Sequence, residues 1–221
     1  MNSKFRIIIA LLFAVITVEE LRSQDLFQLY NNCVELNAGI NSSRINHHLS
    51  NADGSVNYPS TGVYFGAEKC LLPFNDGRIN CSIIGGLLFS FDKSGPSNSF
   101  FSSLKETHIK VPVYLRLYDD IIQAIFPSIT NIEIYPAIGP TFSCGISSSR
   151  DNNGERVDNY RSHSFRRFDI GIGAEISLYW KKIVGIRIAY CSGVINRSPQ
   201  LNTFDNTFSI GLLWLLRTDE Y

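Results

Sequence analysis

The stretch RFDIGIGAEISLYW, from Arg167 to Trp180, decides the fold. Apolar side chains occupy every second position from Phe168 onward, and small or polar residues such as Gly171 and Glu175 lie between them. A helix would scatter this pattern over all of its faces, whereas a β-strand places alternate residues on opposite faces. The stretch is therefore predicted to be a strand with one apolar face and one polar face.

The same alternation recurs along the chain and predicts eight strands in total. The other seven candidates lie near residues 34–41, 62–68, 79–90, 109–118, 132–143, 184–191 and 208–216. Long polar segments follow every second strand, and shorter connections follow the others. The long segments are roughly 42–60, 92–107, 147–165 and 192–205. This arrangement is typical of an antiparallel up-and-down meander with its long loops at one end.

Charge and the N-terminal segment restrict the class of protein. The 221 residues contain 20 Lys+Arg and 20 Asp+Glu, so no basic field is available to hold a nucleic acid. Lys4 and Arg6 precede an apolar run from Ile7 to Val18, which is too short to span a membrane as a helix and is typical of a secretory signal. We therefore expect residues 1–24 to be a signal peptide and residues 25–221 to form one barrel domain.

The composition of the polar face indicates which side of the sheet meets water. That face is mostly Gly, Ala, Ser and Tyr with isolated charges, which suits the crowded interior of a closed barrel. The apolar face is then expected to meet lipid, with aromatic side chains near the strand ends as an interfacial girdle. The predicted girdle residues are Phe89, Phe91, Phe142, Phe168, Trp180, Tyr190 and Phe208. The predicted fold is all-β: an eight-stranded antiparallel up-and-down transmembrane β-barrel with a side-chain-filled lumen.

Charged residues on the polar face are expected to form ion pairs, because a narrow lumen leaves little water to hydrate them. If the strands flanking the turn at 181–183 pair, Glu175 and Arg187 lie opposite or diagonal to each other, and Lys110 and Arg116 can similarly face Glu133. The predicted lumen charge network comprises Glu35, Glu68, Lys110, Arg116, Glu133, Asp169, Glu175 and Arg187. We interpret the network as a structural plug; the alternatives are a proton- or ion-conducting path and acid–base chemistry.

Five blocks of the sequence resemble the PorT-like outer-membrane β-barrel family. They are HIKVPVYLRL (108–117), YPAIGP (135–140), FDIGIGAEISL (168–178), VGIRIAY (184–190) and NTFSIGLLWLL (206–216). The resemblance implies an eight-stranded outer-membrane barrel, and the family's namesake is associated with protein secretion across the outer membrane. The terminal Tyr221 departs from the pattern of such barrels, because it is out of phase with the apolar face of the last strand.

No constellation in the sequence predicts catalysis, a cofactor or a metal site. His163 lies between Ser162 and Ser164, but no orienting acid stands at a defined spacing, so a membrane-embedded lipid hydrolase is only an alternative. The five cysteines contain no CxxC pair and fit neither a disulfide framework nor a zinc site.

The predicted function is therefore that of an exported, non-enzymatic outer-membrane protein with a structural or interaction role. Its expected partners are outer-membrane lipid and, through the long loops, envelope or secretion proteins. Five arginines between Arg150 and Arg167, together with Asp151, Glu155 and Asp158, form a mixed-sign cluster that could contact anionic head groups or a partner protein. The other alternative is a soluble periplasmic, lipocalin-like barrel whose apolar face turns inward around an apolar ligand.

Overall fold

The computed structural model describes residues 33–48, 55–75, 80–94, 103–118, 132–152, 155–180, 183–198 and 202–217. The predicted signal peptide lies outside these residues. The strands are β1 (Cys33–His48), β2 (Ser55–Asn75), β3 (Asn80–Ser94), β4 (Ser103–Leu117), β5 (Ile132–Asn152), β6 (Glu155–Asp158), β7 (Phe168–Trp180), β8 (Val184–Gly193) and β9 (Asn202–Arg217). Within the described ranges there is no helix with the length and apolar character needed to cross a membrane.

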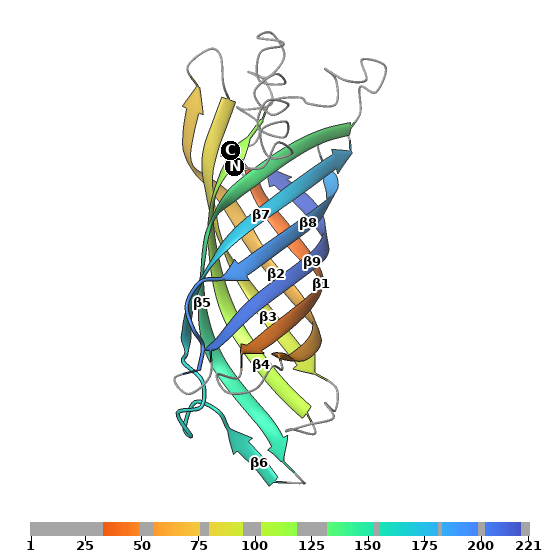
Figure 1. Cartoon of the computed structure of the whole chain (residues 1–221). Coiled ribbons are helices and arrows are strands. Elements are labelled where there is room, and N and C mark those ends of the chain that lie inside the picture. Colours follow the sequence, from red (N-terminus) through yellow and green to blue (C-terminus); the bar gives the residue numbers. More distant parts are fainter. Residues whose placement is uncertain are drawn as a thin grey trace.

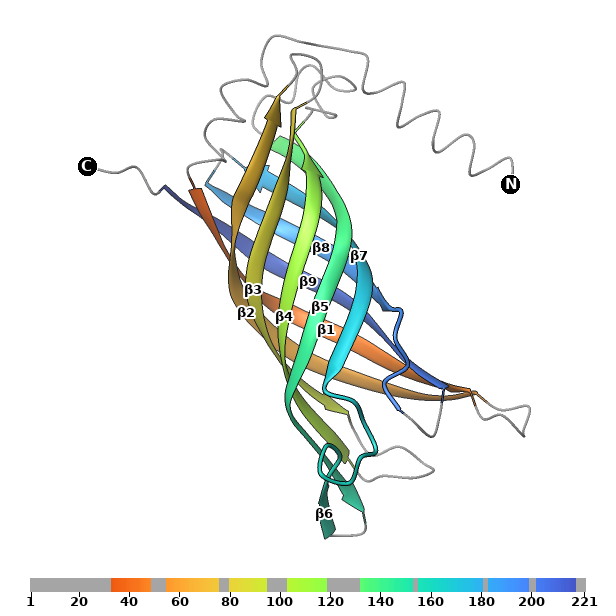
Figure 2. The same cartoon turned by 90° about the vertical axis from the view of Figure 1, so that its left-hand side faces the viewer.

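The strands form a closed antiparallel barrel. Each strand pairs with the next in the order β4-β3-β2-β1-β9-β8-β7-β5, and a further pairing between β4 and β5 closes the ring. Eight strands build the wall, as the alternation predicts, and the short β6 pairs only with the end of β5. Figures 1 and 2 show this β5–β6 hairpin extending beyond one end of the barrel. We call that end the loop end, and the opposite end, where β7 turns into β8, the turn end.

The apolar face of the sheet lies on the outside. Ile40, Leu212 and Phe168 are 65%, 69% and 70% exposed, whereas Glu35 and Arg187 inside the barrel are 4% and 2% exposed. This is the inverse of a water-soluble barrel, in which apolar side chains fill the interior. The lipocalin-like alternative, which needs the apolar face turned inward, is therefore not favoured.

The strands are longer than the alternation predicts, so much of the predicted loop sequence is sheet. β1 and β2 pair as far as His48 and Ser55, inside the segment 42–60. β3 and β4 pair as far as Ser94 and Leu104 in the same way, inside the segment 92–107. The alternation fails there because most side chains of these extensions are polar and the few apolar ones, such as Leu104, do not recur at every second position. This removes the periodic signal although the backbone ladder continues.

The third and fourth long segments also contain strand. β5 runs on to Asn152, and β6 occupies residues 155–158, both inside the segment 147–165. Gly193 and Asn202 extend β8 and β9 into the segment 192–205. The wall therefore continues beyond its apolar part at the loop end.

Two glycines on the inner wall make room for tyrosines. A Cβ atom at Gly173 would collide with the hydroxyl of Tyr114, and one at Gly211 would collide with the hydroxyl of Tyr64. Each tyrosine extends along the inner wall, past the adjacent strand, and lies against backbone two strands away. The tyrosine side chains that fill the lumen therefore need glycine, which has no side chain, at the positions that they contact.

Candidate functional site

The lumen is closed near the turn end by a layer of tyrosines. Tyr118, Tyr135 and Tyr179 are nearly fully buried, and Tyr135 lies with its ring centroid 5.2 Å from that of Tyr118 and 5.9 Å from that of Tyr179. Their hydroxyls are used: Tyr118 shares a 2.8 Å hydrogen bond with Ser82, and Tyr135 donates to Glu133 Oε2 at 2.8 Å. This layer fills the lumen with buried rings, and the hydroxyl of Tyr179 faces the charges above it.

Five of the eight predicted lumen charges meet directly above the tyrosines. Arg116 lies 2.7 Å from Glu35 and 2.8 Å from Glu175. Arg187 lies 2.7 Å from Glu35 and 3.3 Å from Glu175, and it donates to both carboxylate oxygens of Glu68. Tyr179 adds a hydrogen bond to Glu35. All five charged groups are at most 4% exposed, so each charge depends on the others for stabilisation.

The register explains why these residues meet. Glu35 and Glu68 are direct cross-strand partners on β1 and β2, which places two carboxylates side by side. Arg187 pairs with Ser177, one inward position from Glu175, so the predicted contact of Arg187 with Glu175 is diagonal. Like charges directly opposite each other destabilise a sheet. Two guanidinium groups from β4 and β8 offset this repulsion.

The predicted contacts of Glu133 are wrong. Arg116 reaches Glu35 and Glu175 across the lumen instead. Lys110 pairs with Ser143, ten positions along β5 from Glu133, which is about 30 Å at the rise of a strand. Asp169 pairs with that same Ser143, so it too lies far from Glu133.

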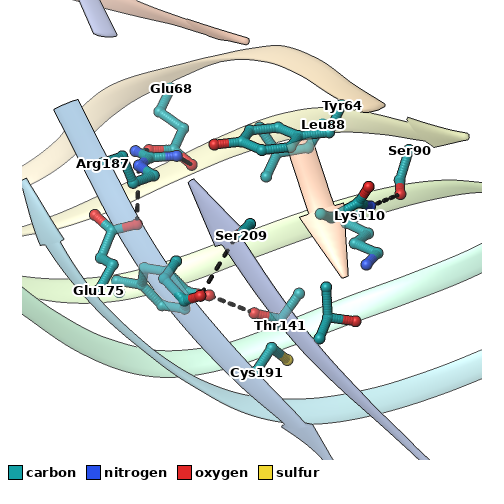
Figure 3. Close-up of a pocket in the computed structure, with 14 residues that line it drawn as sticks. Tyr64, Glu68, Leu88, Ser90, Lys110, Thr141, Glu175, Arg187, Cys191 and Ser209 are labelled. Carbon is teal, nitrogen blue, oxygen red and sulfur yellow. Dashed lines mark hydrogen bonds and ion pairs between the residues drawn. The ribbon is translucent and has the colours of Figure 1, made fainter. Parts of the chain in front are cut away.

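Lys110 instead lines a cavity of about 60 Å³ on the loop-end side of the network. Figure 3 shows Lys110 near Ser90 and Thr141, with Glu68, Glu175 and Arg187 at the other side of the same cavity. Tyr114 and Thr141 share a 2.7 Å hydrogen bond at its wall. The cavity has room for about four water molecules, enough to hydrate one ammonium group but not to form a channel.

A second charged cluster, absent from the predicted set, closes the lumen at the loop end. Arg197 lies 2.7 Å from Glu106 and 3.4 Å from Asp205, and His108 lies 3.6 Å from Glu106. Ser148 also donates to Glu106 at 2.8 Å. Glu106 lies an even number of residues from Lys110 and Arg116 on β4, so the same alternation could have predicted that it faces the lumen. Arg197 lies in irregular chain, where no such alternation exists.

This cluster lies outside the apolar part of the wall, because the outward neighbours of Glu106 are Lys105 and Thr107. Burial alone would raise the pKa of Glu106, but the positive charge of Arg197 and the hydrogen bond with His108 outweigh it and hold the pKa well below its ordinary value. Burial alone would lower the pKa of Arg197, but the negative charges of Glu106 and Asp205 hold it above its usual range. The pair is therefore ionised at neutral pH.

Residues 155–167, which we call the hairpin cap, are anchored to this cluster. The backbone N–H of Arg166 donates to the carbonyl of Arg197 at 2.7 Å, and the Arg197 guanidinium lies 5.2 Å from the ring centre of Phe165. Asn159, fully buried, donates to Ser148 Oγ at 2.9 Å. Asp158 accepts the backbone N–H groups of residues 160 and 161. The cap is an ordered structure although it contains only four strand residues.

The hairpin cap presents its basic side chains to solvent. Arg156, Arg161 and Arg166 are exposed, and the closest carboxylate contact of Arg161 is 3.7 Å from Asp158. Arg167 lies over the ring of Tyr160 at 5.0 Å. These arginines are the ones that the sequence places in a mixed-sign cluster.

The predicted girdle residues lie on the outer wall. Phe91, Phe142 and Phe208 are between 42% and 45% exposed, Tyr190 is 50% exposed, and Phe89 is half-buried. Tyr190 and Phe208 are direct cross-strand partners. Further exposed aromatic residues were missed. They include Phe65, which stacks on Phe89, Phe74 on β2, and Trp214, which, like Trp180, pairs with Val184 near the turn end.

The residues of the hydrolase alternative lie on the exposed part of the hairpin cap. Ser162 and Ser164 share a 2.8 Å hydrogen bond with each other, and His163 is exposed with a positive φ of 53°. Among the described residues, no group of three His, Cys, Asp or Glu side chains is placed to hold a metal ion. Cys33 is buried, and Cys70, Cys81, Cys144 and Cys191 are half-buried.

Comparisons with known proteins give similarity in structure only. No protein-family model matches the sequence, and no curated protein sequence matches it. The chain is similar to Ail, the attachment invasion locus protein of Yersinia pestis, with 11% identity and a TM-score of 0.45 over 84% of this chain and 99% of that one. Neisserial surface protein A is 14% identical with a TM-score of 0.47 over 82% and 96% of the two chains. The outer membrane enzyme PagL is 3% identical with a TM-score of 0.44 over 79% and 98%.

At these identities the fold assignment rests on the strand pairing of this chain itself. The resemblance to the PorT-like family stays a prediction.

Proposed function

We propose that this protein is an integral outer-membrane β-barrel with a structural or interaction role. The observation that carries the proposal is the continuous band of exposed apolar side chains around a closed barrel with a charged interior. Only a closed barrel or a helix satisfies every backbone hydrogen bond in hydrocarbon. With lipid around the outer face and paired charges on the inner face, both faces of this wall are stable.

Envelope fractionation followed by an alkaline carbonate wash tests the location. The full chain should remain in the outer-membrane pellet, and its release into the supernatant would overturn the proposal. A substitution provides a second readout: Leu212, 69% exposed within the band, meets lipid in this proposal. Leu212→Arg should lower the free energy of unfolding in lipid vesicles by about 2–4 kcal/mol. The same change at a water-exposed position would have little effect.

The lumen serves as a structural plug in this proposal, and the protein forms no pore. The tyrosine layer, the five-residue charge network and the Glu106–Arg197 cluster close the barrel at three levels. A conducting path would need continuous water, and the described cavity of about 60 Å³ is confined between two of these levels. The role of the barrel is then to hold the loop end at the outer surface.

The hairpin cap is the proposed docking surface for an envelope protein, with a secretion component as the specific candidate that the PorT-like resemblance supplies. An ordered, exposed surface binds with less loss of conformational entropy than a flexible loop does. A photo-crosslinking residue at Arg156 should capture a discrete envelope partner in intact cells. The matched position is Lys69, exposed on the outer wall toward the turn end, and it should not capture the same protein. Equal capture at both positions would argue against a cap-specific partner.

We propose no enzymatic activity for this chain. The mutual hydrogen bond of Ser162 and Ser164 supports this, because neither hydroxyl is directed to a base. Lipid products from cells expressing the wild type and the His163→Ala variant should be identical. Loss of a deacylated lipid in the variant would favour the hydrolase alternative.

A further inference from the structure

Two lysines stand directly opposite each other on the outer wall, just beyond the apolar band. Lys93 on β3 and Lys105 on β4 are cross-strand partners, and both are exposed. Directly opposed side chains on one face have Cβ atoms about 5 Å apart, and like charges in that position destabilise the sheet. The wall therefore holds two positive charges together where the local sheet alone would disfavour them.

The neighbouring carboxylates do not neutralise these lysines. Asp92 is next to Lys93 in the sequence and Glu106 is next to Lys105, but both carboxylates lie on the inner face. There Ser90 donates to Asp92, and Arg197 binds Glu106. In the outward row, Lys93 is followed on β2 by Thr61, and Lys105 is followed on β5 by Ser149.

The next outward position beyond Ser149 is Asp158 on β6. It is two strands from Lys105, and its carboxylate accepts two backbone N–H groups and contacts Arg161. Asp151, which is diagonal to Lys105 on the outward face of β5, is the direct cross-strand partner of Arg156. Among the described residues, no carboxylate lies within ion-pair distance of Lys93 or Lys105. The row offers two ammonium groups flanked by two hydroxyls, which is a donor set suited to a phosphate group.

An aromatic platform lies directly below this row. Phe89, Phe91 and Lys93 follow one another on the outward face of β3, about 6.6 Å apart. Phe65 on β2 stacks on both phenylalanines, with ring centroids 5.5 and 6.0 Å away. Figure 2 shows β2, β3 and β4 side by side. One patch therefore combines an apolar surface at acyl-chain depth with a pair of positive charges at the depth of head groups.

We propose that this patch binds a phosphorylated glycolipid of the outer leaflet, with its phosphate between Lys93 and Lys105 and an acyl chain against Phe65, Phe89 and Phe91. The inference rests on the proposed membrane location, because the patch meets head groups only if the band lies in lipid. The two opposed lysines then gain the counter-charge that the protein itself does not supply.

The test measures binding of bisphosphorylated lipid A and its dephosphorylated form to the purified full-length barrel in phosphatidylcholine vesicles. The wild type should bind the phosphorylated form preferentially, and Lys93→Ala with Lys105→Ala should weaken that binding about 30-fold. Lys93→Arg with Lys105→Arg should retain it. Lys69→Ala, a lysine on the same outer wall toward the other end, should leave it unchanged. Migration of the unheated protein on a gel identifies variants that fail to fold.

Equal binding of the two lipid forms by a folded wild type, or equal binding by the alanine and control variants, would overturn the inference. Those results leave the proposed location intact if the protein still resists the carbonate wash. Release of the wild type by that wash would overturn both. If the alanine variant does not fold, the comparison of the arginine variant and the wild type at rising salt decides: phosphate binding that is insensitive to salt contradicts the inference.

Discussion

Removal of the Arg187 charge should destabilise the barrel far more than removal of an exposed arginine does. Arg187 is 2% exposed and contacts three carboxylates, of which Glu68 depends on it most. In the Arg187→Met variant, Glu68 keeps only the more distant Arg116, whose nearest nitrogen lies 3.9 Å from Oε2. Breaking a buried ion pair by removing one partner costs about 3–5 kcal/mol, because the other charge is left without compensation.

The matched control is Arg161→Met, because the Arg161 side chain is 88% exposed and its ion pair with Asp158 is long. Exposed pairs contribute about 0–1 kcal/mol. Trp180 and Trp214 are both 58% exposed on the outer wall, so their fluorescence reports the loss of the lipid environment during urea unfolding. Similar unfolding free energies for the two variants would refute the reasoning that the five-residue network holds the barrel together.

A double variant separates lost charge compensation from lost packing. Adding Glu68→Gln to Arg187→Met removes the carboxylate that the first change leaves unpaired. The double variant should then be more stable than the sum of the single effects, with a coupling energy of about 0.5–3 kcal/mol. Strict additivity would mean that the loss arises from the packing of the long Arg187 side chain.

Three further predictions concern other parts of the molecule. Because the pKa of Glu106 is lowered, its contribution to the stability of the hairpin cap is complete above the unfolded value of about 4.3 and is lost as the pH falls through the lower folded value. After correction for intrinsic exchange, hydrogen exchange of the Arg166 amide should accelerate on acidification in the wild type. It should show no such dependence in Glu106→Gln. Gly173→Val should displace Tyr114 and lower the free energy of urea unfolding by about 1–3 kcal/mol, whereas the same change at the exposed Ala174 should not. In planar lipid bilayers the wild type should produce no stepwise ion current, and regular conductance steps would contradict a plugged lumen.

The inward and outward faces of the strands could be predicted from the sequence, because polar and apolar side chains alternate along each strand. In β7 the alternation places Glu175 inside and Ile176 outside, as the structure has them. The contact of Glu175 with Arg187 could also be predicted, since one tight turn joins their strands. Both inferences use only the period of a strand and the nearest pairing.

The rest of the network could not be predicted, because it depends on how the barrel closes. Glu35, Arg116 and Arg187 lie on β1, β4 and β8, and they meet across the lumen rather than along a ladder. Which inward positions reach the same height is set by the stagger of all eight strands, and one strand's alternation carries no information about it. The contact of Glu106 with Arg197 was missed for a related reason: Arg197 lies in irregular chain without a period.

The distribution of charge between the inside and outside of the barrel explains where function belongs in this molecule. The five-residue network near the turn end pairs three buried carboxylates with two buried guanidinium groups. Charges that are paired and buried in this way stabilise a register and have little capacity to bind a further ion. At the loop end the basic groups exceed their partners: Lys93 and Lys105 face each other, and the arginines of the hairpin cap are exposed. Uncompensated charge is available for binding, so we place recognition at the outer rim and assign the lumen to stability.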